Sequence, residues 1–417
     1  MRTKILASFL AVTMGVGAMT FATPVSAAPE ASHVAGQIMV KFRDNGAAAD
    51  VLRRLGLEVG PGIGSTGARL ITVPTGKELQ FVEALNRNPA VEYAELDQVV
   101  TPATTDEYFP RQYALQNDGQ SFTNTNGDIL VAAGTADADV DAVEAWSVTT
   151  GSDIRVAVLD SGVANDNSDI TPNVVARANF TKGESGDDNY GHGTHMAGSV
   201  AATADNSAGV AGVCPGCKVL DGKVLDDSGI GSSSSLANGI NWSVNNGAKV
   251  INMSLGVRAT RTLETAVDNA WNKGSVLVAA AGNGGNQRKI YPGAYPNVIA
   301  VAATDNNDAK ASFSTYGSSW VDVAAPGVNV YSTFPNHEFV LGTQNNRSWG
   351  YDVGNGTSVS SAIVAATAAL AWSADPGATH TSVRTKVEST SDKIAGTGTY
   401  WAHGRVNAHN AVCSNCD

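Results

Sequence analysis

Residues 156–162 read Val-Ala-Val-Leu-Asp-Ser-Gly, an apolar run that stops at a carboxylate and a glycine. Further short apolar runs follow it, and segments with helical spacing lie between or after them. A continuous apolar run of this length is typical of a strand that is covered on both faces of a parallel sheet. The sequence therefore predicts an α/β fold with a mostly parallel central sheet and helices on both faces.

The pattern gives these elements approximate positions. The expected strands are residues 154–159, 219–225, 250–254, 276–280 and 298–302, and the expected helices are residues 192–203, 233–246, 261–273 and 357–373. Strands that alternate with helices in this way are joined by right-handed crossovers.

Four polar residues fall where these elements begin or end. Asp160 directly follows the first expected strand, and Asn283 follows the fourth. His192 and Ser358 each stand at the start of a helix. Ligands of open parallel sheets bind at the carboxyl ends of the strands. We therefore expect the four residues to lie at one edge of the sheet, where a cleft forms.

The sequence around these residues is rich in glycine. Residues 191–195 read Gly-His-Gly-Thr-His, residues 356–360 read Gly-Thr-Ser-Val-Ser, and residues 279–283 read Ala-Ala-Ala-Gly-Asn. The order Asp, His, Ser is the order of the catalytic triad in subtilisin. Together the four stretches resemble the subtilisin-like serine proteases, most closely the thermitase-like branch, over the chain after about residue 100.

The chemistry of peptide hydrolysis assigns a role to each residue. A serine hydroxyl is a weak nucleophile near neutral pH and needs an adjacent base. We assign Ser358 as the nucleophile and His192 as the base, with Asp160 holding the other ring nitrogen. The Asn283 amide and the Ser358 N–H, unpaired at a helix start, are the expected oxyanion donors. His195 completes a pattern that also resembles a metal motif, and we interpret it as a packed structural histidine.

By the same resemblance, the substrate binds as an extended strand along exposed backbone edges. The residues expected to contact it are Ser254, Leu255, Gly256, Gly229, Gly231, Ala280, Ala281, Gly282 and Ile290. Small walls without a charged residue favour a large apolar or aromatic side chain before the cut. The alternative is that these glycines serve ordinary turns.

Calcium is the expected cofactor, and no organic cofactor is expected. The resemblance implies side-chain and backbone carbonyl ligands at Asp106, Asp169, Thr203, Asn206, Ala208 and Val210. Oxygen ligands from one loop and from distant carboxylates suit this hard cation. The alternative is a solvated turn rich in Asp and Asn.

The N-terminal part of the chain differs from the rest. Residues 1–28 carry basic residues before an apolar run and small residues at its end, which is typical of a secretory signal peptide. Residues 29–103 have strand and helix patterns in a βαββαβ-like order, and they resemble the subtilase propeptide, a small α+β inhibitor domain. Residues 104–417 form the expected catalytic domain. The alternatives are a membrane anchor and a permanent accessory domain.

Composition limits the partners. The formal net charge is −12, and an acidic protein repels phosphate backbones, so we expect no nucleic-acid partner. No apolar stretch after the N-terminus reads as long enough to cross a bilayer. We expect a secreted, extracellular monomer that acts on protein or peptide substrates and has its own propeptide as an intramolecular inhibitor.

Four cysteines form two local pairs, Cys214 with Cys217 and Cys413 with Cys416. Export favours disulfides, and we expect each pair to close locally. A zinc site and a redox pair are the alternatives, and the sequence does not choose among the three possible connectivities.

Two features depart from the family pattern. The family usually has Met after the serine and Pro-His a few positions later, where this chain has Val359, Ala362 and Ile363. Residues 336–355 are longer than in compact members, and we expect a surface hairpin or loop near the cleft. A narrow-specificity processing protease and a degenerate, peptide-binding subtilase are the competing interpretations. The complete set of catalytic residues argues against the second.

Overall fold

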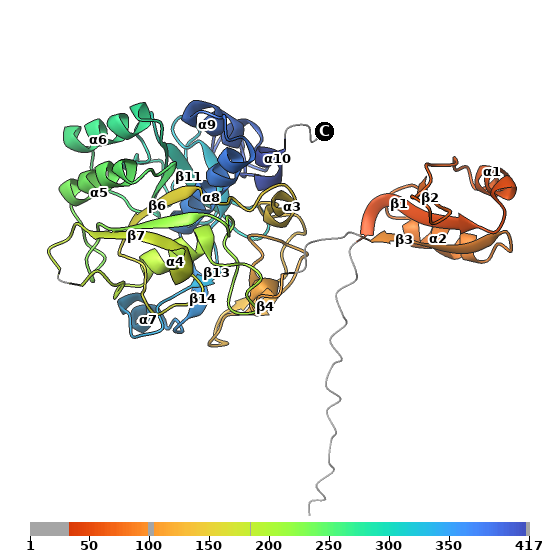
Figure 1. Ribbon diagram of the computed structural model, residues 1–417, viewed down its shortest axis with the longest axis horizontal. Helices are drawn as coiled ribbons and strands as arrows, with labels where there is room; N and C mark the ends of the chain where they lie inside the picture. The colour runs from red at the N-terminus through yellow and green to blue at the C-terminus, as the bar shows by residue number, and fades with distance from the viewer. Residues whose placement is uncertain (1–32, 99–103, 184, 414–417) are drawn as a thin grey trace, which may run out of the picture. The chain divides into compact units, whose positions relative to one another are not determined.

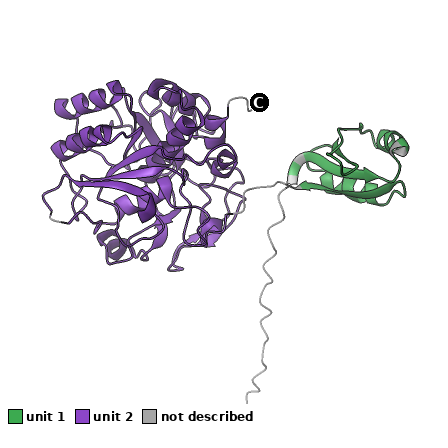
Figure 2. Ribbon diagram, viewed as in Figure 1, with its two compact units in different colours: residues 1–100 green, residues 101–417 purple. Residues whose placement is uncertain are grey.

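The computed structural model describes residues 33–98, 104–183 and 185–413. The chain divides into two compact units, residues 1–100 and residues 101–417 (Figure 2). The expected signal peptide, residues 1–28, lies outside the described residues.

The first unit is a three-stranded antiparallel sheet with two helices. The strand order is β2-β1-β3. In chain order the elements are β1 (His33–Phe42), α1 (Asn45–Arg54), β2 (Ala68–Thr72), α2 (Glu78–Asn86) and β3 (Val91–Gln98). Its core includes the fully buried side chains Ile38, Val40, Leu52, Ile71 and Leu85. The βαββαβ-like prediction carried one strand too many, because the segment before β2 makes only an isolated bridge between Gly62 and Arg69.

The second unit is built on a seven-stranded sheet whose neighbouring strands all pair in parallel (Figure 1). Across the sheet the strands are β12 (Val323–Pro326), β11 (Ile299–Thr304), β10 (Val276–Ala280), β9 (Val250–Met253), β6 (Arg155–Asp160), β8 (Lys218–Lys223) and β7 (Val174–Asn179). The predicted parallel α/β fold is therefore confirmed. Sequence reasoning missed the two outermost strands: β7 alternates half-buried and exposed residues, and β12 is a four-residue run that ends at a proline.

Helices cover both faces of this sheet (Figure 1). On one side lie α5 (Ser233–Asn245) and α6 (Arg261–Asn272), and on the other lie α4 (His192–Ala201) and α8 (Thr357–Ala374). Strand β6 contributes side chains to the core on each face of the sheet, because its successive side chains point to opposite faces. The side chains of residues 156 and 158 join the core with α4 and α8, whereas those of residues 157 and 159 join the core with α5 and α6.

Helix α8 is the central helix of the fold. It packs on strands β6, β9, β10, β11 and β12, and residues 357–372 are all buried. Its 18 residues are apolar enough to cross a membrane by length and composition, so the sequence-based statement that no later stretch is long enough was wrong. Here the apolar residues serve the interior of the unit instead.

Shorter elements complete the second unit. They are η1 (Phe109–Arg111), β4 (Phe122–Thr123), β5 (Leu130–Val131), α3 (Ala142–Trp146), η2 (Thr171–Asn173), β13 (Val330–Thr333), α7 (Val340–Asn345), β14 (Tyr351–Gly354), α9 (His380–Ser389) and α10 (Ala408–Val412). The segment 336–355, expected as a hairpin or loop, contains helix α7 and strand β14, which pairs with β13.

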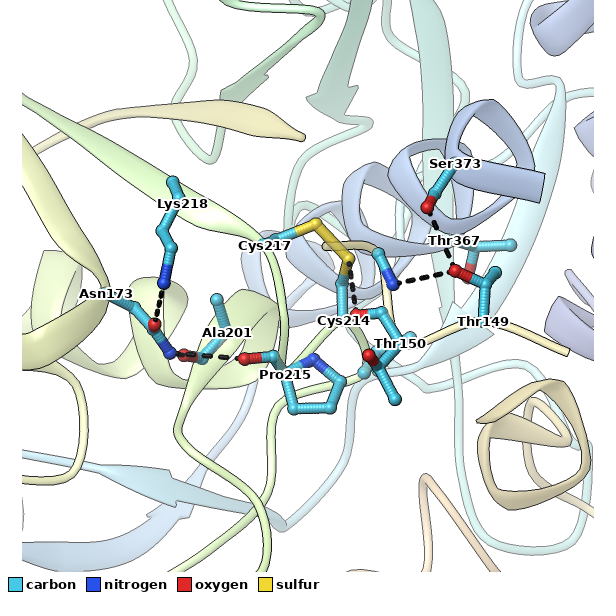
Figure 3. The surroundings of a disulfide bond; sticks show 12 residues. Thr149, Thr150, Asn173, Ala201, Cys214, Pro215, Cys217, Lys218, Thr367 and Ser373 are labelled. Atoms are coloured by element: carbon cyan, nitrogen blue, oxygen red, sulfur yellow. Dashed lines mark hydrogen bonds between the residues drawn. A yellow bond between two sulfur atoms is a disulfide. The ribbon is translucent and has the colours of Figure 1, made fainter. Parts of the chain in front are cut away.

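Cys214 and Cys217 form a buried disulfide, as predicted for this pair (Figure 3). It lies directly before β8, at the amino ends of the strands, and it packs beside Thr150 and the last turns of α8. This pairing excludes zinc and a free thiol at these two residues. Cys416 lies outside the described residues, so the second pairing stays a prediction.

Candidate active site

The carboxylate of Asp160 and the imidazole of His192 meet at the carboxyl edge of the sheet. Asp160 is the last residue of β6 and is fully buried, and His192 is the first residue of α4. The distance from His192 Nδ1 to Asp160 Oδ1 is 2.7 Å. The same carboxylate oxygen accepts the N–H of Ser161 at 2.8 Å. These contacts fix the ring orientation and leave Nε2 for the opposite side of the ring.

Gly193 allows this approach of α4 to β6. A Cβ atom at residue 193 would lie 2.1 Å from the carbonyl oxygen of Gly162 and 3.1 Å from Cβ of Asp160. Any side chain there would push the helix, and His192 with it, away from the strand. The glycine after the histidine is therefore a packing requirement.

A second buried carboxylate, Asp188, holds the start of α4. It accepts hydrogen bonds from the N–H of Gly191 at 2.8 Å, from the N–H of Thr194 at 2.8 Å and from the Thr194 hydroxyl at 2.6 Å. It also accepts the Ser161 hydroxyl at 2.8 Å, so it joins the helix start to the turn after Asp160. Sequence reasoning missed Asp188, although an acid just before a helix start is a recognisable capping signal.

The pKa of His192 is raised above its ordinary value of 6.5. Burial is the largest single influence and by itself lowers it. The charge and hydrogen bond of Asp160, with the charge of Asp188, together outweigh that burial. His192 therefore keeps its proton to a higher pH than a free histidine does.

Ser358 and Asn283 converge beside Gly356. Ser358 is the second residue of α8, and its N–H has no hydrogen-bond partner among the described residues. A Cβ atom at residue 356 would lie 3.3 Å from Asn283 Nδ2, 3.5 Å from Ser358 Oγ and 3.6 Å from Ser358 N. The hydroxyl and the two N–H donors thus border one small space that only glycine leaves open.

Thr357 aims the Asn283 side chain. Its backbone N–H and its hydroxyl both donate to Asn283 Oδ1, each at 2.9 Å. The Thr357 hydroxyl in turn accepts the N–H of Gly282 at 3.0 Å. With Oδ1 occupied, the Nδ2 donors of Asn283 are free to face the cleft. Thr357 is a positioning residue that the sequence analysis quoted in its motif but gave no role.

Two cavities flank these residues. One, of about 390 Å³, is lined by His192, by Gly229 and Gly231, and by residues 254–257. The other, of about 730 Å³, shares residues 254–257 and adds Ala280, Gly282, Asn283, Ile290 and Ser358. Every residue predicted to contact the substrate except Ala281 lines one of them.

The Ala281 side chain does not belong to this cleft. It is fully buried in a cluster with Ala302, Val321, Ala324 and Trp401, because it points to the opposite side of the chain from its neighbours. Its expected place in the wall of the specificity pocket is therefore wrong for the side chain.

The larger cavity carries charge that the sequence analysis did not place there. Arg258, Arg288 and Lys289 line it at its exposed rim, and no carboxylate does. The walls named from the sequence carry no charge, and these three cations stand outside them at the rim. Cations at the rim repel a cationic side chain such as Lys or Arg.

His195 lies on the inner side of α4. It is buried, its Nε2 lies 3.2 Å from the carbonyl oxygen of Val330, and its ring packs on Phe334 at 4.9 Å. Burial is the main cause that lowers its pKa to about 3. This environment agrees with a packed, neutral histidine.

The expected calcium residues gather around the loop 203–210. Asp106 accepts the N–H groups of Asp205 and Asn206, each at 3.0 Å, and Asp169 accepts the side chain of Asn206 at 2.6 Å. Both acids are buried, and burial raises the pKa of Asp169 to about 6, with the charge of Asp106 adding to it.

The backbone of this loop also offers ligands. The carbonyl oxygens of Thr203, Ala208 and Val210 accept no hydrogen bond from any described residue. No group of three or more His, Cys, Asp or Glu able to hold a metal exists among the described residues. A site here would instead combine two carboxylates, one amide and backbone carbonyls. That oxygen-only donor set fits calcium.

In this site a carboxylate is hydrogen-bonded to an imidazole, and a serine at a helix start and a free side-chain amide line the same cavity as the imidazole. This is the arrangement of a serine hydrolase with an Asp-His-Ser triad. The chain order Asp160, His192, Ser358 on a parallel sheet is that of the subtilisin type of such enzymes.

Comparisons with known proteins agree with this class. Residues 151–407 match the model of the subtilase family, and residues 20–97 match the fervidolysin N-terminal prodomain. The chain is 46% identical to thermitase from Thermoactinomyces vulgaris over 66% of this chain and 93% of that protein. It is 38% identical to a thermophilic serine proteinase from Bacillus sp. (strain AK1) over 91% of this chain and 88% of that protein.

A solved protease structure from Pseudoalteromonas arctica superposes with a TM-score of 0.64 at 29% identity, covering 75% of this chain and 99% of that chain. The chain belongs to the subtilase family, and it is a thermitase-like, subtilisin-like serine protease with an N-terminal prodomain.

The raised pKa of His192 predicts the acid limb of the pH–rate profile. A base must be unprotonated, so kcat/KM should fall as the pH drops through a midpoint above 6.5. Initial rates on a substrate without ionisable groups measure it. Asp160→Asn removes the charge and should lower the midpoint. A parent midpoint at or below 6.5 would contradict the electrostatics described here.

The role of Thr357 predicts a selective loss of turnover. Thr357→Val removes one hydrogen bond to Asn283 Oδ1, so kcat should fall roughly tenfold with little change in KM, less than the 10²–10³ cost of losing an oxyanion donor. Thr367→Val is the matched control, because its hydroxyl is also buried in α8 but bonds only to Ile363 O. Equal kcat values for the two variants would remove the positioning role.

Proposed function

We propose that this chain is a secreted serine endopeptidase that hydrolyses peptide bonds through Asp160, His192, Ser358 and Asn283, and that it is made as a self-processed zymogen. One observation carries the proposal. His192, hydrogen-bonded to the buried Asp160, lines the same cavity as Ser358 and Asn283.

The reaction begins with acylation of the serine. Ser358 Oγ adds to the carbonyl carbon of the scissile bond while His192 Nε2 takes the hydroxyl proton. The resulting oxyanion accepts hydrogen bonds from Asn283 Nδ2 and from the N–H of Ser358. When the C–N bond breaks, His192 gives its proton to the leaving amine. Asp160 stays ionised and stabilises the imidazolium in between.

Deacylation repeats these steps with water. His192 takes a proton from the water molecule as the water oxygen adds to the acyl carbon. The second oxyanion occupies the same donors, and its collapse expels Ser358 Oγ, which recovers the proton from His192. Both halves need a neutral imidazole at the start, which explains the dependence on the pKa of His192.

The proposed preference is for an apolar or aromatic side chain before the cut. The larger cavity offers Ala280, Gly282 and Ile290 as small or apolar walls, and its rim cations disfavour Lys and Arg. The substrate backbone would lie along residues 254–257 and 229–231, where glycines allow close approach.

Secretion and self-processing are proposed together. We assign residues 1–28 as a cleaved signal peptide, residues 29–103 as the propeptide and residues 104–417 as the mature enzyme. The basic residues and the apolar run at the N-terminus support secretion. The match of residues 20–97 to a prodomain supports an intramolecular inhibitor. We further propose that the mature enzyme is a monomer.

The resemblance to the subtilases implies calcium as a cofactor and no organic cofactor. We propose one calcium ion held by the carboxylates of Asp106 and Asp169, the amide of Asn206 and the carbonyls of Thr203, Ala208 and Val210. The ion would neutralise two buried acids and tie the loop 203–210 to the start of the unit. It takes no part in the chemistry at Ser358.

Self-processing is tested by comparing masses after expression in a host without extracellular proteases. The parent should lose the residues before about position 104, whereas Ser358→Ala should stay full length or remain bound to its propeptide. Ser389→Ala, an exposed serine at the end of α9, is the control and should mature like the parent. Identical cleavage of the parent and Ser358→Ala would show that another enzyme makes the cut.

Calcium removal should affect stability more than turnover. A ligand present at 100 times its Kd adds about 2.7 kcal/mol to the free energy of unfolding, so excess chelator should lower Tm by roughly 5 °C. Initial rates at a low temperature should change little. Asp169→Asn should abolish the chelator effect, and Asp118→Asn, an exposed acid outside the site, should retain it. An unchanged Tm for the parent would rule out this site.

A further inference from the structure

A third cavity, of about 250 Å³, opens beside His192 and Ser358. It contains none of the residues 254–257 that both substrate cavities share. Those two cavities already account for the acyl half of the substrate. The third cavity is lined by both Ser358 and His192, which protonates the leaving amine, whereas each of the other two is lined by only one of them. We therefore assign this space to the leaving half. We call it the leaving-side cavity. Its lining includes Met196, Phe334, Leu341, Asn345, Arg347 and Val353.

One wall of the leaving-side cavity comes from the segment 336–355. The N–H groups of Val340 and Leu341 donate to the carbonyls of Asn189 and Tyr190 at 3.0 and 3.1 Å. Those acceptors directly precede the turn into α4. Phe339 is buried and stacks on Phe334 at 5.0 Å. Helix α7 is therefore anchored beside the catalytic histidine and forms a fixed boundary of the cavity.

Arg347 places a positive charge in this wall. Its side chain is half-buried, and its guanidinium donates to the carbonyl of Asn345 at 2.9 Å. The pKa of Asp128 is lowered mainly by hydrogen bonds from Asn346 and Asn124, and the charge of Arg347 adds to this effect. Among the described residues no carboxylate lines the cavity itself.

The charge of Arg347 also acts on His195, which lines the cavity. Burial is the main cause that lowers the pKa of His195, and the charges of His192 and Arg347 lower it further.

The remaining lining defines what this charge can bind. Leu341 and Val353 present apolar surface, and Asn345 and Asn355 present amide groups. A cavity whose lining combines apolar side chains with a guanidinium fits a short aliphatic chain with a carboxylate at its tip. Arginine binds such a group with two parallel hydrogen bonds.

We propose that the leaving-side cavity binds a carboxylate on the leaving half of the substrate, and that Arg347 is the residue that determines this specificity. The proposal rests on the assignment of Ser358 and His192 as nucleophile and base. Two sources supply the carboxylate: an acidic side chain directly after the cut, or the C-terminal carboxylate of a short leaving peptide.

The side-chain source is tested with two isomeric quenched peptides of equal net charge. One has Glu directly after the cut and Gln at a remote position, and the other has the two exchanged. The comparison cancels the long-range repulsion between acidic peptides and an enzyme of net charge −12. The parent should favour the first peptide by about 5- to 10-fold in kcat/KM, and high salt should reduce the ratio.

Three variants localise the preference. Arg347→Gln should bring the ratio close to one, and Arg347→Lys, which keeps the charge but not the planar fork, should retain part of it. Arg261→Gln is the control: it removes one positive charge at the exposed start of α6 and should keep the full ratio.

The terminal source is tested with a peptide that leaves only two residues after the cut, supplied as a free acid and as an amide. A preference for the acid that disappears in Arg347→Gln assigns the cavity to the chain terminus. If the parent cleaves all paired peptides at equal rates, or if Arg347→Gln keeps the preference, the proposal is overturned. If Ser358→Ala cleaves no peptide but the parent cleaves both members of each pair at equal rates, this inference alone is overturned. The proposed function then still stands.

Discussion

The buried hydrogen bond between Asp160 and His192 is the contact on which the other features of the site depend. It requires the end of β6 and the start of α4 to approach within the length of two short side chains. Gly193 makes that approach possible, since any Cβ there would collide with the backbone at Gly162. The sheet supplies the rest, because β6 and β10, which flank β9, end at the same edge and bring Asp160 and the Asn283 loop to it.

The turn that follows the buried Asp160 is itself held by buried polar groups. The turn after Asp160 is fixed by Asp188, which receives the Ser161 hydroxyl, and by the buried Lys223, which donates to Ser161 O at 2.6 Å and to Asp227 at 2.8 Å. Buried charges are tolerated when they are paired and hydrogen-bonded in this way. The same two acids raise the pKa of His192, so one network supports both the geometry and the basicity of the imidazole.

The sequence predicted the parts whose local signal is strong. Five buried strands, four helices and the edge that gathers Asp160, His192, Asn283 and Ser358 follow from apolar runs and from glycine-rich turns. The edge strands β7 and β12 were missed because partial exposure or shortness weakens an apolar pattern.

Other features depend on long-range contacts that no local pattern encodes. Thr357 acts on a residue 74 positions away, and Asp188 ties together two segments. Loops from different parts of the chain form both the larger cavity and the leaving-side cavity. No local pattern therefore shows that the rim cations and Arg347 line these cavities. Ala281 was misplaced because a motif gives the position of a residue and not the direction of its side chain.

The central claim is that Ser358 is the nucleophile activated by His192, and reaction with a serine-directed sulfonyl fluoride tests it most directly. Peptide mapping of the inactivated mature enzyme should locate a single adduct on Ser358, with loss of activity in proportion to labelling, and His192→Ala should label far more slowly. An adduct on another residue, or full inactivation with Ser358 unmodified, would contradict the account.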